Sequence, residues 1–205
     1  YLENNKIMEQ NEKTNQIKLI KDVLTELDCS NINYCLLRNY EFLIGDPMPV
    51  ESLDTTVAKK DFPRMKEILL KKGFTQRKQQ FSLVHKAFFK LTSELQLVSF
   101  DIQVGGIHWN DLRYFNEVIL TRKVKKDYFY VLSQNDFFVM LIAHSILGKR
   151  KFKLRYQQQL LEEVKTIDPK DVLGELEKIF GTENAQNVFR NVELNKFEAI
   201  KYQRL

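Results

Sequence analysis

Residues Glu51–Phe62 read ESLDTTVAKKDF, the pattern of a short strand that runs directly into a helix. Successive side chains of a strand point to opposite faces, so this stretch has two faces. One face carries Leu53, Thr55 and Val57, and the other carries Ser52, Asp54 and Thr56. A strand that delivers carboxylates to a metal usually has two acids at alternate positions, whereas Asp54 is alone here. The stretch therefore indicates either a metal-binding strand with one acid replaced or an ordinary strand.

A second acid, Asp101, lies in the apolar run LVSFDIQVGG, which covers residues 97–106. A lone carboxylate inside an apolar strand is costly unless it has a partner. If the strands that carry Asp54 and Asp101 are neighbours, the two carboxylates converge on one hard cation. Mg²⁺ binds one or two protein carboxylates, completes its shell with water and phosphate oxygens, and can orient a triphosphate. The alternative is that each aspartate caps a turn or pairs with a lysine.

Hydrophobic periodicity and turn residues predict the other elements of the first half of the chain. Apolar residues at helical spacing between Ile17 and Leu27 predict a helix over about residues 12–28. Asp61 as N-cap, with Pro63 in the first turn, predicts a second helix that ends at Gly73. The expected strands are residues 34–37, 52–58, 74–78, 82–91, 95–104 and 128–132, with a loop marked by Gly45, Pro47 and Pro49 and with Gly105–Gly106 ending the strand over 95–104.

The chain is expected to be helical from residue 133 onward. Ser133–Asp136 reads as a capping box before a largely apolar helix that Gly148 closes. Further helices are expected over 153–166, 169–180 and 182–190, the second of them capped by Asp168. The predicted class is therefore α+β: residues 1–132 form a mixed sheet flanked by helices, and residues 133–205 form a helical C-terminal region.

The order of these features resembles the nucleotidyltransferase-fold superfamily, the polymerase-beta-like proteins. The shared features are a strand that ends in LLRNYE (36–41), a Pro/Gly loop, the Asp54 strand, KKDF (59–62) and FDI (100–102). The similarity covers about residues 33–105 and is strongest to little-characterised bacterial and archaeal members. It implies Mg²⁺-dependent transfer of a nucleotidyl group from a nucleoside triphosphate to a hydroxyl acceptor, which the sequence does not identify.

Superfamily members use two acids in D-x-D on one strand and a third acid on a later strand. Alignment on the shared valine and on KKDF places Ser52 and Asp54 on the D-x-D positions, and a shift of two residues places Asp54 and Thr56 there. Both alignments keep the same face of the strand, so periodicity does not choose between them. Asp101 matches the third acid and is the implied catalytic base. The implied metal ligands are Asp54 and Asp101, with Ser52 or Thr56.

Two departures from the superfamily pattern leave an alternative open. One carboxylate is replaced by a hydroxyl in either alignment, and the Gly-Ser or Gly-Gly motif that normally approaches the triphosphate is absent. Arg38 and Asn39 occupy the approximate place of that motif, where they could hold a phosphate or cap the strand. The alternative is a catalytically degenerate fold that acts as a nucleotide-binding or partner-binding module, with RNA among the candidate partners.

The net charge of +5 suits a phosphate-bearing partner. The most basic run is Lys149–Arg155, in which Lys149 and Arg150 are candidate nucleotide-binding residues and Phe152 and Tyr156 offer stacking surfaces. Nucleic-acid binding through this run and through residues 121–126 is a further hypothesis, which predicts a steep salt dependence. A solvated face without a ligand is the simpler interpretation of each basic run.

Composition bounds the remaining classes. No apolar run approaches the roughly 18 residues needed to span a bilayer, so we expect no membrane partner and a cytoplasmic location. Cys29 and Cys35 are expected to be one buried and one free thiol rather than a disulfide. The histidines lack the spacing of metal motifs, and His85 is expected to be a core or edge histidine rather than a ligand.

Overall fold

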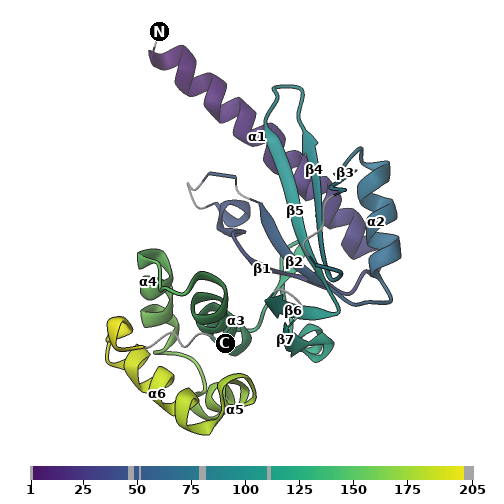
Figure 1. The fold of residues 1–205 in the computed structure, drawn as a ribbon. Coiled ribbons are helices and arrows are strands. Elements are labelled where there is room, and N and C mark those ends of the chain that lie inside the picture. Colours follow the sequence, from purple (N-terminus) through teal and green to yellow (C-terminus); the bar gives the residue numbers. More distant parts are fainter. Residues whose placement is uncertain (1, 46–48, 51, 79–81, 110–111, 201–205) are drawn as a thin grey trace. The chain divides into compact units, whose positions relative to one another are not determined.

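The computed structural model describes residues 2–45, 49–50, 52–78, 82–109 and 112–200 (Figure 1), with side chains from Thr14 onward. Pro47 of the predicted loop and Glu51 of the ESLDTTVAKKDF stretch lie outside these residues. The chain forms two compact units. One comprises Tyr1–Asp111 and Phe115–Val131, and the other comprises Leu112–Tyr114 and Leu132–Leu205.

The first unit is built on a seven-stranded sheet with the order β3-β4-β5-β2-β1-β9-β8. Its strands are β1 (Tyr34–Arg38), β2 (Leu53–Val57), β3 (Thr75–Gln76), β4 (His85–Leu91), β5 (Leu97–Val104), β8 (Val124–Lys126) and β9 (Phe129–Val131). The pairs β2–β5 and β1–β9 are parallel, whereas β1–β2, β3–β4, β4–β5 and β8–β9 are antiparallel. This mixed sheet and its flanking helices confirm the predicted α+β class.

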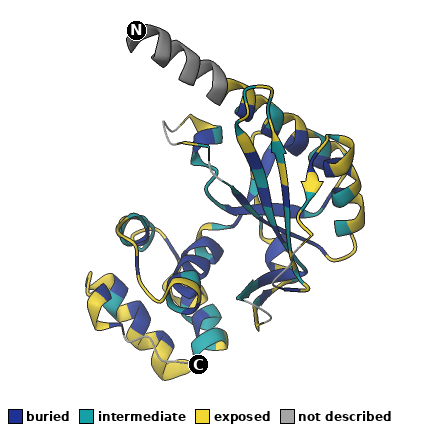
Figure 2. Cartoon of the chain, turned by 45° about the horizontal axis from the view of Figure 1, so that its top comes forward, coloured by how far each residue is buried: buried dark blue, intermediate teal, exposed yellow. Residues whose placement is uncertain are grey.

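Helices α1 (Leu2–Cys29) and α2 (Phe62–Lys71) supply the helical side of the core of this unit. Leu24 of α1 and Leu69 of α2 belong to one buried cluster with Leu53 of β2 and Phe100 of β5. Figure 2 shows that the central strands are largely buried, whereas both helices keep an exposed outer side. α1 is longer than predicted, because it begins at Leu2 rather than near residue 12.

The KKDF stretch leads into α2 as predicted, but Asp61 does not cap the helix with its side chain. Asp61 occupies the N-cap position, and its carboxylate accepts a hydrogen bond from the backbone N–H of Asn33 at 3.2 Å. Pro63 lies in the first turn, and Gly73 follows the last turn with a φ of 82°. The Asp61 side chain therefore ties the start of α2 to the segment that enters β1.

The double glycine ends β5, as expected, but a further strand that was not predicted begins at Gly106. β5 ends at Val104, and β6 (Gly106–Trp109) then pairs with β7 (Leu112–Asn116) in a separate two-stranded sheet. A Cβ atom at Gly106 would lie 2.1 Å from the backbone oxygen of Phe115. Gly106 also has a φ of 130°, which side chains rarely tolerate. The second glycine is thus required by the close approach of β7.

The second unit contains the predicted helices. They are α3 (Gln134–Ala143), α4 (Leu154–Glu163), α5 (Pro169–Phe180) and α6 (Thr182–Glu193). Ser133 caps α3 by accepting a hydrogen bond from the backbone N–H of Asp136 at 3.2 Å, and Asp168 caps α5 in the same way. α3 does not close at Gly148, because it continues as a π-helix, η3 (His144–Lys149), before the chain turns at Arg150. Short 3₁₀ segments are η1 (Glu41–Ile44), η2 (Glu117–Thr121) and η4 (Phe197–Ala199).

Two further expectations concern the thiols and membrane spans. Cys29 is exposed and Cys35 is buried, and these two residues do not form a disulfide, as expected. Among the helices within the described residues, none combines the length and the apolar character required to cross a lipid bilayer.

Candidate active site on the polar face of the sheet

Asp54 and Asp101 are direct neighbours on the sheet. β2 and β5 are parallel, and their register pairs Asp54 with Asp101 and Thr56 with Gln103. Residues paired in this way point to the same side of a sheet, which is opposite to the side that carries Leu53 and the core. We call this side the polar face. The two acids that the sequence singled out are therefore brought together on one face of adjacent strands, which is the arrangement that the metal-site hypothesis requires.

Arg38 and Asn39 at the end of β1 hold the Asp54 carboxylate. β1 runs antiparallel to β2, and a shift in register between Leu36 and Arg38 places Arg38 opposite Asp54. The Arg38 Nε donates to Asp54 Oδ2 at 2.5 Å, and the Asn39 Nδ2 donates to the same oxygen at 3.2 Å. Such irregularities often re-aim a side chain at a functional site. Arg38 is therefore the basic neighbour of the acid pair.

The surroundings of this ion pair are largely dry, since the Arg38 and Asp54 side chains are 17% and 13% exposed. Asn39 has a φ of 60°, the left-handed region that asparagine tolerates better than most residues. This backbone turn directs the Asn39 side chain to both the Asp54 carboxylate and the carbonyl oxygen of Ser52, the latter at 3.4 Å. Asp54 is thus fixed by charge and by hydrogen bonding before any ligand binds.

His85 joins the acid pair from the neighbouring strand. β4 and β5 are antiparallel with His85 opposite Gln103 and Ala87 opposite Asp101, so His85 lies on the polar face. Its Nε2 lies 3.7 Å from Asp101 Oδ1, and its side chain is 48% exposed. His85 is therefore not buried in the core, and its exposure fits the edge histidine that was the other expected alternative. Its proximity to Asp101 follows from the pairing register of the β4–β5 hairpin.

The pKa of Asp101 is raised above its ordinary value of 3.8. Burial is the main cause, since it disfavours the charged carboxylate, and the nearby charge of Asp54 raises the pKa further. His85, Arg38 and Arg77 oppose this rise, because their positive charges favour the carboxylate. Asp101 therefore holds its proton more tightly than an ordinary aspartate does.

The two hydroxyl residues beside Asp54 have different roles. The Thr56 side chain is fully buried, and its Oγ1 lies 2.8 Å from the carbonyl oxygen of Gly106 and 3.2 Å from that of Gln103. Its hydroxyl is therefore committed to the backbone at the β5–β6 bend. Ser52 is half-buried and lies just before β2. These contacts favour the alignment in which Ser52, rather than Thr56, stands at the position of the replaced acid.

The residues of the polar face that could hold a metal ion are Asp54 and Asp101. Both donors to Asp54 use Oδ2, which leaves Oδ1 for a cation next to the carboxylate of Asp101. Across the ranges that the structure describes, no group of three or more His, Cys, Asp or Glu side chains is placed to hold a metal. Two protein carboxylates and substrate oxygens are sufficient for a single Mg²⁺, whereas two-metal sites need more carboxylates.

The remaining predicted nucleotide-binding residues, Lys149 and Arg150, belong to the helical unit. Lys149 is the last residue of η3, and Arg150 follows it with a φ of 51°. Both side chains are exposed. Their location at the end of a π-helix is notable because π-helical turns occur often at functional sites.

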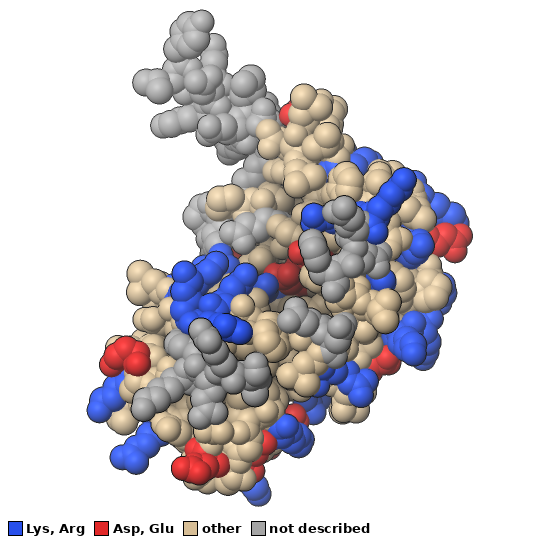
Figure 3. Space-filling view, in the orientation of Figure 1, with Lys and Arg blue, Asp and Glu red and all other residues tan. Residues whose placement is uncertain are grey.

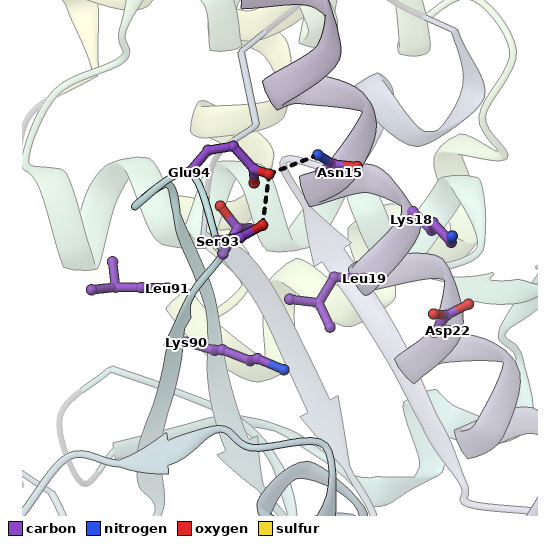
Figure 4. Close-up of a pocket in the computed structure, with 9 residues that line it drawn as sticks. Asn15, Lys18, Leu19, Asp22, Lys90, Leu91, Ser93 and Glu94 are labelled. Carbon is purple, nitrogen blue, oxygen red and sulfur yellow. Dashed lines mark hydrogen bonds between the residues drawn. The ribbon is translucent and has the colours of Figure 1, made fainter.

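A separate depression lies between α1 and the tip of the β4–β5 hairpin (Figure 4) and has a volume of about 260 Å³. Glu94 accepts hydrogen bonds from Asn15 at 3.1 Å and from Ser93 at 2.6 Å, and Gln16 donates to the carbonyl oxygen of Leu97 at 3.0 Å. These contacts anchor the hairpin tip to α1. Neither acid of the polar face lines the depression, so it is separate from the candidate active site.

No protein-family description and no curated protein matches the chain. Solved structures do match. The antibiotic-resistance factor ANT(2'')-Ia is similar with a TM-score of 0.53 and 9% sequence identity, over 89% of this chain and 97% of that one. JHP933 from Helicobacter pylori is similar with a TM-score of 0.42 and 11% identity, over 91% and 95% of the two chains. The chain therefore has the nucleotidyltransferase fold, as its sequence resemblance indicated.

Proposed function

We propose that the protein is a nucleotidyltransferase that binds a nucleoside triphosphate on the polar face and transfers its nucleotidyl group to a hydroxyl acceptor. The observation that carries this proposal is the pairing of Asp54 with Asp101 on adjacent parallel strands of this fold. Asp54 and Asp101 would hold one Mg²⁺, which neutralises charge on the phosphates when it is bound. The acceptor class stays open between a sugar, another small molecule, a protein and an RNA end.

Each residue of the polar face has a role in this proposal. Asp101 is the base that accepts the proton of the acceptor hydroxyl, and its raised pKa makes it a stronger base than an ordinary aspartate. Arg38 and Asn39 keep Asp54 in place through their bonds to Oδ2. Arg38 and Arg77 also contribute positive charge near the acids, where the phosphates of a nucleotide would lie.

Calorimetric titration with ATP, GTP, CTP and UTP in the presence of Mg²⁺ tests this proposal. We expect at least one nucleotide to bind, and Asp54→Asn or Asp101→Asn to weaken that binding by about tenfold or more, which corresponds to about 1.4 kcal/mol. Asp22→Asn is the matched control, since Asp22 is an exposed residue of α1. Absence of both heat and a thermal shift with all four nucleotides would contradict the proposal.

A second candidate function is favoured by the same ion pair. Arg38 already neutralises Asp54, and a hydroxyl replaces one acid, so the fold could bind a nucleotide without transferring it. This candidate predicts Mg²⁺-nucleotide binding without pyrophosphate release for any acceptor that is offered. Release of pyrophosphate that depends on Asp101 separates the enzyme from this binding module.

A further inference from the structure

The structure separates the basic runs of the sequence into two groups. In the first group, lysines form ion pairs with acids of the first unit. Lys71 pairs with Glu67 at 2.9 Å, and Lys72 pairs with Glu26 at 2.8 Å. Lysines of the run over 121–126 also contact residues of the first unit. Lys125 pairs with Asp28 at 2.8 Å, and the Lys123 Nζ lies 4.1 Å from the centre of the Tyr130 ring. Lys72, Lys123 and Lys125 therefore contact partners within the first unit and are weaker candidates for a ligand surface, whereas Lys71 lies in an exposed surface pair that contributes little to stability.

The second group is the basic turn, which we define as Lys149, Arg150, Lys151 and Lys153, between η3 and α4. All four side chains are exposed. Within the described part of the chain, none of the four forms an ion pair with an acidic side chain. A space-filling view shows Lys and Arg gathered on the helical unit beside α4 (Figure 3). The basic turn is therefore a concentration of positive charge without an internal counter-charge.

Two buried aromatic residues fix the shape of this turn. Phe152 is 7% exposed and packs against Phe197, with ring centres 5.1 Å apart. Tyr156 is 3% exposed and meets the His144 ring at 5.9 Å. The backbone N–H of Lys151 also donates to the carbonyl oxygen of Ser145 at 3.0 Å. Phe152 and Tyr156 are thus anchors rather than the stacking surfaces that the sequence suggested.

The positive charges of the basic turn destabilise the folded protein when no ligand is bound. Lys153 stands at the N-cap of α4 without a side-chain cap, and the first turn of that helix has no acidic residue. The N-terminal end of a helix carries partial positive charge and favours anions, so cations there are destabilising. Mutual repulsion among the four exposed cations adds to this effect. A ligand with several anionic groups would reduce both the unfavourable charge at the N-terminus of α4 and the repulsion among the four cations.

We propose that the basic turn binds the phosphodiester backbone of a nucleic acid without reading its bases. A small ligand such as a free triphosphate gains most of its affinity in a concave pocket, whereas a polymer can bind an exposed turn through several phosphates. Base recognition by stacking is excluded for Phe152 and Tyr156 because both rings are buried. A membrane surface is disfavoured, since Leu154 is the single large apolar side chain exposed within the turn and the first turn of α4. The proposal does not depend on nucleotidyl transfer.

The test is binding of a fluorescent single-stranded RNA of mixed sequence to the full chain, measured by anisotropy over a series of salt concentrations. The variant combines Lys149→Gln, Arg150→Asn, Lys151→Gln and Lys153→Gln, with asparagine chosen because it tolerates the left-handed backbone at position 150. We expect RNA affinity to fall by tenfold or more. The slope of log affinity against log salt should decrease by about 3, since each contacted phosphate of a single strand contributes about 0.7.

The matched control combines Lys165→Gln, Lys170→Gln, Arg190→Gln and Lys196→Gln, which removes the same charge from exposed positions of the same unit. The control should retain most of its RNA affinity. Equal losses in both variants, or wild-type affinity in the first, would overturn the proposal. A third outcome would also overturn it: the wild type does not bind RNA, and the first variant no longer binds ATP. The basic turn would then hold a free triphosphate rather than a nucleic acid. Circular dichroism of both variants verifies that they are folded.

Discussion

Two hydroxyl residues near Asp54 could mark the replaced acid, and their surroundings predict opposite effects of the same substitution. Ser52→Asp places a third carboxylate at the half-buried entrance of β2, so we expect Mg²⁺ to bind more tightly, by about tenfold. Thr56→Asp places a charge at a fully buried position that faces two carbonyl oxygens. It should destabilise the protein by about 3 kcal/mol or more. Mg²⁺ calorimetry and urea unfolding measure the two effects.

This comparison has a clear contrary outcome. If Thr56→Asp binds Mg²⁺ more tightly and remains stable, Thr56 rather than Ser52 occupies the acid position. The hydrogen bonds of Thr56 to the β5–β6 bend would then be dispensable.

The raised pKa of Asp101 predicts how stability depends on pH. A carboxyl whose folded-state pKa is raised stabilises the folded state below its ordinary pKa of 3.8, and this contribution is lost as pH rises through the folded-state value. At neutral pH, Asp101→Asn should therefore raise the melting temperature, by about 1 to 2 °C because the side chain is 37% exposed. The gain should vanish below pH 4. Melting curves between pH 3 and pH 8 measure it, with Asp22→Asn as the control that shows no gain.

Individual residues of the polar face were predictable to different degrees. Asp54 and Asp101 were predictable because a carboxylate within an apolar strand needs a partner. Arg38 was predictable because it ends the strand before the Asp54 strand. The proximity of His85 to Asp101 was not predicted, because it depends on the register of the β4–β5 hairpin, which the sequence around it does not specify.

At the level of elements, Gly106 and Gly174 predict opposite responses to alanine. A Cβ at Gly106 would lie 2.1 Å from the Phe115 backbone oxygen, and the φ of 130° is unfavourable for alanine. Gly106→Ala should therefore destabilise the protein by about 2 to 4 kcal/mol. Gly174 lies inside α5, where a Cβ atom would meet nothing within 4 Å beyond its own helix backbone and chain neighbours. Gly174→Ala should stabilise the protein by up to about 1 kcal/mol, because alanine favours helices.

Urea unfolding followed by circular dichroism measures both substitutions, and each serves as the control for the other. Equal stability of Gly106→Ala and the wild type would show that β6 and β7 can separate without loss. That outcome would remove the stated reason for the second glycine.

Long elements with a clear period were predictable, and short ones were not. α2, α3 and α5 have the expected starts because Pro63, Ser133 and Pro169 are strong local signals. β6 and β7 were missed because they are short and are held by the approach of two backbones at Gly106. The π-helix at the end of α3 was missed because its residues have ordinary helical patterning.

For the whole molecule, the net charge of +5 does not show where a polyanion would bind. Lys123 and Lys149 lie in runs of similar composition, yet Lys123 packs on Tyr130 inside the fold and Lys149 is exposed. Tertiary partners distant in sequence, such as Asp28 for Lys125, make this difference. Basic runs in a sequence are therefore candidates for a ligand surface, and the fold decides which of them remain available.

The overall fold was predictable although identity to a similar solved structure is as low as 9%. The order of strand, acid-bearing strand and KKDF helix start constrains which strands can be neighbours, and burial of alternate residues then sets the face of each acid. Chemistry depends on single side chains that the fold tolerates in several forms. Fold and activity are therefore separable in this chain.

The ion pair between Arg38 and Asp54 has an evolutionary consequence. A carboxylate that is neutralised by its own chain can remain in the sheet without a metal ion, because its charge is already balanced. If the proposed function holds, a substitution of Asp101 or Ser52 that ends catalysis would leave this charge balance unchanged, so selection for folding would not remove it. A lineage with this ion pair would then be able to exchange catalysis for binding, or regain it, through proteins that all fold.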